Sequence, residues 1–144
     1  MPPSQALYLK GSTLWRKNPV TLIFERVAQM RLVPVPTATQ EYADSTNHDS
    51  EGAFEENEPT IKRGDESGAT LVFHPDIAMH NQIYDDFINQ TKLIWRSFFP
   101  DGVRGFEFTA RVSRYGFGGG GLNFTDIAQL EYSLKVTGLP TRLT

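Results

Sequence analysis

Residues 106–137 read FEFTARVSRYGFGGGGLNFTDIAQLEYSLKVT, and this stretch decides the fold class. Apolar and polar residues alternate over Phe106–Val112, and the same two-residue period returns, with one interruption, over Phe124–Val136. A two-residue period is typical of a β-strand that buries one side and exposes the other. Five of the six residues in Gly116–Gly121 are glycines, which suits a hairpin turn. The stretch therefore predicts two long amphipathic strands joined as a hairpin.

Shorter strands are expected elsewhere in the chain. They are predicted over 22–33, 37–43, 69–73 and 93–99. Together with the long hairpin they give about six or seven strands, with no internal repeat and no domain boundary. The sequence therefore predicts a single, mainly β domain over residues 1–144. A lone copy of such a domain would leave sheet edges unpaired, which is a hazard unless a barrel closes or a partner covers them.

One helix is predicted over residues 76–91, with Asp76 as its N-cap directly after Pro75. Its apolar stripe is expected to comprise Ile77, His80, Ile83, Tyr84, Phe87 and Ile88. The paired carboxylates Asp85 and Asp86 are then expected on the outward side, where charge keeps the helix soluble.

Composition excludes several classes of protein. The chain has 144 residues, a formal net charge of −3 and no cysteine. Without cysteine there are no disulfides, thiolate zinc sites or cysteine nucleophiles. No apolar run approaches the roughly 18 residues that a membrane-spanning helix needs. The N-terminus lacks the apolar core of a signal peptide, so we expect the protein to stay in the compartment where it is made.

The negative charge is concentrated in one segment. Residues 41–66 hold nine acids and two bases, a balance of −7, whereas the rest of the chain holds eight acids and twelve bases, a balance of +4. Phe54 is the one large apolar residue of Asp44–Glu58. Such a composition cannot bury a core of its own, and we predict a long acidic surface loop there.

The candidate chemical sites are weak. The glycine run is followed by Leu122 and a strand, whereas a phosphate-binding loop needs a lysine and a helix. His48, His74 and His80 lack the spacing that places two imidazoles on one helix face, and the acidic loop lacks the full calcium-loop pattern. There is no G-x-S-x-G nucleophile motif. We therefore expect no catalytic residue, no metal and no cofactor, and the long strands favour assembly over enzymatic chemistry.

Several segments, taken in order, resemble those of a known family. They are Gly11–Trp15 (GSTLW), Leu32–Pro34 (LVP), the polar Thr37–Tyr42, Lys62–Asp65 (KRGD), Asp85–Ile88 (DDFI), Leu93–Arg96 (LIWR), Phe99–Gly102 (FPDG), Phe106–Arg114 and Leu134–Gly138 (LKVTG). This order is similar to that of the major tail tube proteins of bacteriophages with long, non-contractile tails. The resemblance covers nearly the whole chain, and its specificity lies in the order of elements. The C-terminal immunoglobulin-like domain of some members is not expected here.

The resemblance implies a fold and an assembly. The fold is a β-sandwich or half-barrel with one flanking helix. Six copies form a ring around a continuous inner β-barrel, and rings stack into the tail tube through which DNA is ejected into the host cell. The polar faces of the two long strands are candidates for the lumen, and a net acidic subunit suits a lumen that repels DNA.

The resemblance also implies contact residues and partners. The loop at about 44–58 would reach the neighbouring ring, through Asp49, Glu51, Phe54, Glu55, Glu56 and Glu58. An N-terminal arm at about 1–10 would contact other subunits through Tyr8, Leu9 and Lys10. The implied partners are further copies of the chain, a tape measure protein inside the tube, and terminator and baseplate or distal tail proteins at its ends. Double-stranded DNA would pass without specific binding, no membrane is involved, and the protein belongs to a virion assembled in the host cytoplasm.

Two alternatives stay open. A tail terminator, a baseplate hub or a type VI secretion tube ring could use the same fold, because fold alone does not fix function. A β-barrel that binds a ligand or catalyses a reaction would instead need buried polar or titratable residues around a pocket.

Overall fold

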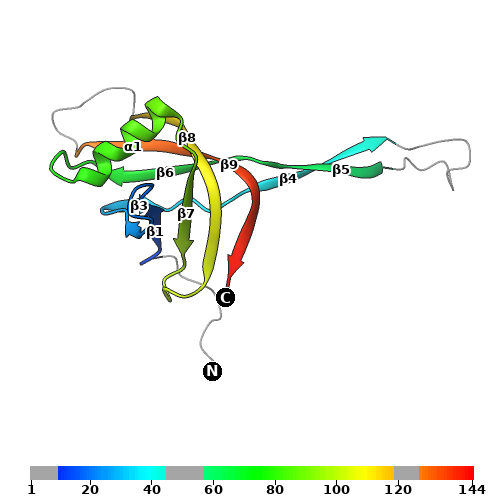
Figure 1. The fold of residues 1–144 in the computed structure, drawn as a ribbon, viewed down its shortest axis with the longest axis horizontal. Coiled ribbons are helices and arrows are strands. Elements are labelled where there is room, and N and C mark those ends of the chain that lie inside the picture. The colour runs from blue at the N-terminus through cyan, green and yellow to red at the C-terminus, as the bar shows by residue number, and fades with distance from the viewer. Residues whose placement is uncertain (1–9, 45–56, 119–126) are drawn as a thin grey trace, which may run out of the picture.

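The computed structural model describes residues 10–44, 57–118 and 127–144, which form a curled main sheet, one helix and a separate two-stranded ribbon (Figure 1). In spatial order the main sheet comprises β2 (Phe24–Arg26), β1 (Thr13–Lys17), β7 (Leu93–Phe98), β8 (Gly105–Phe117), β9 (Gln129–Leu143), β6 (Glu66–Val72) and β3 (Met30–Leu32), all antiparallel to their neighbours. The ribbon pairs β4 (Ala38–Asp44) with β5 (Asn57–Gly64). The helix is α1 (Ala78–Asn89). The predicted fold class, mainly β with one flanking helix, is confirmed.

The long hairpin is the centre of the main sheet, as predicted. Ala110 lies opposite Val136 and Phe117 opposite Leu130, so β8 and β9 pair along most of their length. Gly116 and Phe117 belong to β8 rather than to the turn. The rest of the predicted turn and the start of the predicted second strand, residues 119–126, lie outside the described residues.

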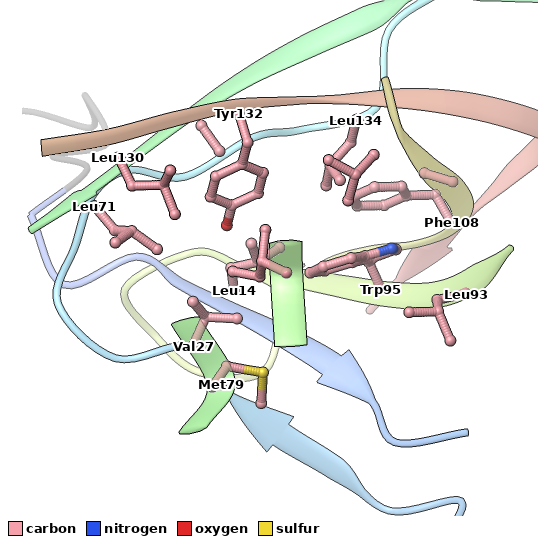
Figure 2. Packing of buried hydrophobic residues seen from close by; sticks show 14 of the residues in the cluster. Leu14, Val27, Leu71, Met79, Leu93, Trp95, Phe108, Leu130, Tyr132 and Leu134 are labelled. Carbon is pink, nitrogen blue, oxygen red and sulfur yellow. The ribbon is translucent and has the colours of Figure 1, made fainter. Parts of the chain in front are cut away.

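The core fills the inside of the curled sheet. Trp95, Tyr132 and Leu14 are fully buried there, and Figure 2 shows them facing one another from three strands. The Tyr132 hydroxyl donates a hydrogen bond across the interior to Met30 Sδ of β3, at 3.5 Å. Burial raises the pKa of Tyr132 far above its usual range. Two donors in this interior, Trp95 Nε1 and Ser97 Oγ, have no hydrogen-bond partner among the described residues.

The predicted strand over 22–33 was wrong in one respect, because it is two strands on opposite edges of the main sheet. β2 pairs with β1, whereas β3 pairs with β6 at the far edge. The chain breaks at Gln29, whose φ of 63° lies in the left-handed region and costs a non-glycine residue about 1 kcal/mol. Val27 donates its N–H to the Leu14 carbonyl, and the Gln29 carbonyl accepts the N–H of Val72. Residues 27–29 therefore hold the two edges close together and curl the sheet towards a barrel.

The helix is shorter than predicted, and its buried face agrees only in part with the predicted apolar stripe, since His80 and Ile83 are buried and Ile77 and Phe87 pack against the core. It spans Ala78–Asn89 rather than 76–91, and Ile77, in an extended conformation, is its N-cap in place of Asp76. The buried positions are Met79, His80, Ile83 and Asp86, whereas Tyr84 and Ile88 are about half exposed. The helix is rotated relative to the apolar stripe because Asp86 takes part in a buried ion pair.

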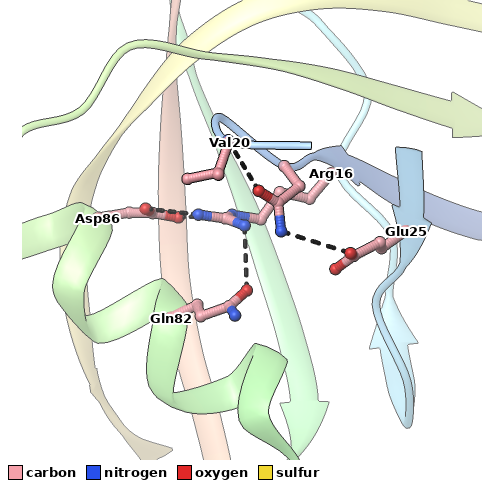
Figure 3. A network of polar contacts seen from close by, with 6 residues as sticks. Arg16, Val20, Glu25, Gln82 and Asp86 are labelled. Atoms are coloured by element: carbon pink, nitrogen blue, oxygen red, sulfur yellow. Dashed lines mark hydrogen bonds and ion pairs between the residues drawn. The ribbon is translucent and has the colours of Figure 1, made fainter. Parts of the chain in front are cut away.

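The ion pair joins α1 to β1. Arg16 Nε and Nη2 donate to the two Asp86 carboxylate oxygens at 2.8 Å each, and Nη1 donates to Gln82 Oε1 at 3.1 Å (Figure 3). Both charged side chains are almost fully buried. A two-pronged pair of this kind fixes distance and orientation together, so it sets how the helix sits on the sheet. α1 is not long and apolar enough to cross a membrane, and no other helix occurs in the described part of the chain.

Arg16→Met should destabilise the protein by about 3–5 kcal/mol, because it leaves the Asp86 carboxylate buried without its partner. The double change Arg16→Met with Asp86→Leu should restore most of that loss, since two apolar side chains need no partner. Urea unfolding measures both. Arg63→Met, which breaks an exposed pair with Glu41, is the matched control and should change stability by about 1 kcal/mol or less. Equal losses in the single and double variants would contradict this account.

Candidate assembly surface

The β4–β5 ribbon is the feature most unlike a self-contained domain. It extends away from the main sheet (Figure 1), and all but three of its side chains are exposed. Tyr42 and Ile61, at 62% and 53% exposure, are large apolar side chains left in solvent. The sequence predicted β4 but missed β5, because Pro59 and three charged residues of Asn57–Gly64 masked its strand character.

Local contacts define the ribbon without giving it a core. Gln40 Nε2 donates to the Ile61 carbonyl at 3.3 Å, and Thr60 Oγ1 donates to the Glu41 carbonyl at 3.1 Å. Arg63 Nε and Glu41 Oε1 form an exposed ion pair at 2.6 Å. Exposed pairs contribute little, and an isolated two-stranded hairpin is marginally stable in water. The outer edge of each ribbon strand has no partner strand in the described chain, so the ribbon is a template for a strand or surface of another molecule.

The root of the ribbon is fixed to the main sheet by a close backbone approach. Asp65 donates its N–H to the Thr37 carbonyl at 2.8 Å and accepts the Val136 N–H at 3.3 Å. A side chain at Gly64 would overlap the Val136 carbonyl group, so only glycine fits there. The KRGD segment therefore fastens the root of the ribbon to β9.

The structure describes Glu58 and Lys10 of the predicted contact residues but none of the others. Asp49, Glu51, Phe54, Glu55 and Glu56 of the acidic loop, and Tyr8 and Leu9 of the arm, lie outside the described residues. Glu58 is exposed on β5, opposite Ala43, near the far end of the ribbon. Lys10 is exposed and lines a groove on the main sheet. β4 ends at Asp44 and β5 begins at Asn57, both at the end of the ribbon farthest from the main sheet (Figure 1).

The polar face of the long hairpin is mixed in charge rather than uniformly acidic. Arg111 of β8 lies directly opposite Lys135 of β9, and Lys135 lies opposite Glu66 of β6. All three side chains are exposed. Two like charges opposite each other repel, so this face gains from a nearby anion.

Among the described histidines, His80 has a structural role. The His80 ring is fully buried, with Nδ1 accepting the His74 N–H and Nε2 donating to the Ala28 carbonyl, both at 3.0 Å. His80 therefore ties α1 to the corner between β2 and β3. Over 10–44, 57–118 and 127–144, no three histidine or acidic side chains lie close enough to hold a metal ion. His48 and Gly119–Gly121 lie outside the described residues.

The arrangement of strands, helix and ribbon matches that of solved tail proteins. The tail of an empty gene transfer agent (GTA) particle with C6 symmetry superposes with a TM-score of 0.76 at 16% identity, covering 96% of this chain and 100% of that one. The chain has the tail tube fold. The SPP1 tail tube gives a TM-score of 0.73 at 9% identity, covering 96% of this chain and 79% of that one. The baseplate of the anti-feeding prophage (AFP) gives 0.69 at 8% identity, covering 99% of this chain and 97% of that one. No protein-family model and no curated protein matches the sequence.

The close approach of Gly64 to Val136 makes the ribbon root a sensitive position. Gly64→Ala should destabilise the protein by about 1–3 kcal/mol and displace the ribbon, because the new methyl group must push the Val136 backbone away. Gly68→Ala on β6 is the matched control, since its added methyl group meets open space, and it should be neutral or slightly stabilising. Thermal unfolding measures the stability of both. Equal stabilities for the two variants would show that the contact is unimportant.

Proposed function

We propose that this chain is a tail tube subunit, six copies of which form a ring that stacks into the tube of a phage-type tail. The observation that carries the proposal is the unpartnered β4–β5 ribbon, which leaves the domain at a fixed angle and is too small to be stable alone. A ring or stack supplies the missing surfaces. The likeness to the C6-symmetric tail supports six copies rather than another number.

The dimensions of such a ring suit the passage of DNA. If each of six copies contributes four strands, the inner barrel has about 24 strands. At about 4.8 Å between strands and a tilt near 40°, its backbone diameter is roughly 48 Å. Side chains reduce this by about 10 Å, which leaves room for a DNA duplex. The bore would also hold a tape measure protein during assembly, with terminator and baseplate or distal tail proteins at its ends.

In this assembly the acidic loop is the contact to the next ring. The segment 41–66 carries −7 and the rest of the chain +4, so head-to-tail stacking brings opposite charges together. Asp49, Glu51, Glu55, Glu56 and Glu58 supply the charge, and Phe54 supplies an apolar anchor. Tyr8, Leu9 and Lys10 of the arm add contacts between subunits. The chain then acts in the virion, after assembly in the host cytoplasm, as a structural protein and not an enzyme.

The bore is expected to release DNA rather than hold it, because cationic contacts bring strong phosphate binding. The facing cations Arg111 and Lys135 would place positive charge in the bore if their face of the sheet lined it. If the polar face of β8 and β9 lines the bore, Glu66 and the tape measure protein must offset this pair.

Electron microscopy of the purified protein tests the proposal directly. Tubes of stacked rings are the expected result. Single rings that never stack would favour the second candidate, a baseplate ring, which the likeness to the AFP baseplate supports. Monomers at all concentrations would contradict both.

Deleting residues 47–56 should leave a folded subunit that no longer forms tubes, because the deletion removes the contact to the next ring and spares the described core. Circular dichroism checks the fold, and electron microscopy checks the tubes. A glycine–serine segment of equal length in place of 47–56 is the control for loop length and should also fail to form tubes. Normal tubes from either variant would refute a role for this loop.

Stacking should weaken as salt increases, because it joins a strongly acidic segment to a mildly basic surface. Light scattering should show shorter tubes at 1 M than at 0.1 M sodium chloride. Changing Glu55 and Glu56 together to glutamine should reduce that dependence on salt. Equal salt dependence in the wild type and the double variant would contradict electrostatic stacking.

A further inference from the structure

The turn between β1 and β2 presents large apolar side chains to solvent. Val20, Leu22 and Ile23 are 87%, 65% and 63% exposed, although a short polar turn would connect the same strands. We name residues 18–23 the apolar turn. Single exposed apolar residues are ordinary, whereas three within four positions form a contiguous apolar patch, which is typical of an interaction surface.

The apolar turn is rigidly built. Asn18 Oδ1 accepts the N–H groups of Val20 and Thr21 at 2.8 and 3.2 Å, and the Asn18 backbone exchanges two hydrogen bonds with Leu22 and Ile23 at 2.9 Å each. Leu22 has a φ of 61°, which an asparagine or glycine would adopt at lower cost. Four hydrogen bonds within the turn therefore hold Leu22 in a strained backbone conformation, as is common at sites of contact.

A complementary groove lies at the other end of β1. We name it the seam groove, because it lies between the start of β1 and the free edge of β3, where the main sheet does not close. Its volume is about 380 Å³, and Met30, Leu32, Val33, Val35, Phe98 and Phe99 give it an apolar lining.

We propose that the apolar turn of one copy inserts into the seam groove of the next copy around the ring. Val20, Leu22 and Ile23 would cover the apolar lining of the groove. Turn and groove are different surfaces of one chain, so the contact is head-to-tail and generates a ring or a filament. This inference deepens the proposed function and rests on it.

The direction of β1 places the contact within a ring. β1 pairs with β7, which runs across the direction of the β4–β5 ribbon (Figure 1). If the ribbon reaches along the tube to the next ring, a contact at the two ends of β1 runs across the tube axis and therefore stays within one ring. About six residues separate Ser12 from Asn18, or roughly 20 Å of extended chain. The turn therefore cannot enter the groove of its own chain.

Cysteine cross-linking tests the contact, because the natural chain has no cysteine. Leu22→Cys and Val35→Cys copies, mixed, assembled and treated with a short bismaleimide reagent, should give covalent dimers that neither variant gives alone. Ile88→Cys, an equally exposed position on α1, replaces Leu22→Cys in the control and should give none. A chain carrying both Leu22→Cys and Val35→Cys should give a ladder that ends at six copies.

Four outcomes would overturn the proposal. Normal tubes that give no mixed dimer would contradict this contact but not the proposed function. Wild-type protein that stays monomeric would contradict both. A ladder that continues beyond six would place the contact between rings. A cross-link within single chains carrying Leu9→Cys and Val35→Cys would show that the chain's own arm fills the groove.

Leu22→Asn gives a second test without reagents. Asparagine tolerates the backbone of Leu22, so the monomer should unfold at the same temperature or higher. Assembly should need at least about tenfold more subunit, because a buried leucine is lost from every contact. Ile88→Asn is the matched control and should assemble at the wild-type concentration. Unchanged assembly of Leu22→Asn would overturn the proposal.

Discussion

The main sheet is shaped by one constraint, namely that a single short segment serves both of its edges. Phe24–Arg26 completes one edge and Met30–Leu32 the other, with only three residues between them. A flat sheet of seven strands would hold its edges far too distant for such a link. The sheet must therefore curl around its apolar contents, and His80 fastens the corner at Ala28 from the helix. The domain so formed is nearly self-sufficient, which concentrates the unsatisfied edges on the β4–β5 ribbon.

The sequence predicts the fold where a pattern is long and local. The two long strands were predictable because a two-residue period persists through Phe106–Val112 and returns before Val136. The division of 22–33 was not, because it depends on the conformation of Gln29, a residue with no special preference for φ above zero. The face of the helix was misjudged for a different reason. Asp86 is an outward residue by polarity, and only its distant partner Arg16 explains its burial.

The contact surfaces were less predictable than the core. Charge composition indicated a loop at 44–58 after a polar strand at 37–43, but not that a second exposed strand, β5, would pair with the first, because a strand without a buried side shows no hydrophobic period. The apolar turn was hidden inside a predicted strand, where Leu22 and Ile23 fit an apolar pattern. Exposure of an apolar residue is a property of the tertiary structure. It therefore becomes visible only once the neighbours of that residue are known.

The bare glycine at the ribbon root has a consequence for mechanics. Backbone packed on backbone, without an intervening side chain, leaves little room for the ribbon to pivot at Gly64. In a stack of identical rings, any change of direction there would be repeated at every level and would accumulate as curvature or twist along the whole filament. The stiffness of a structure many rings long would thus be governed by the absence of a single methyl group in each subunit.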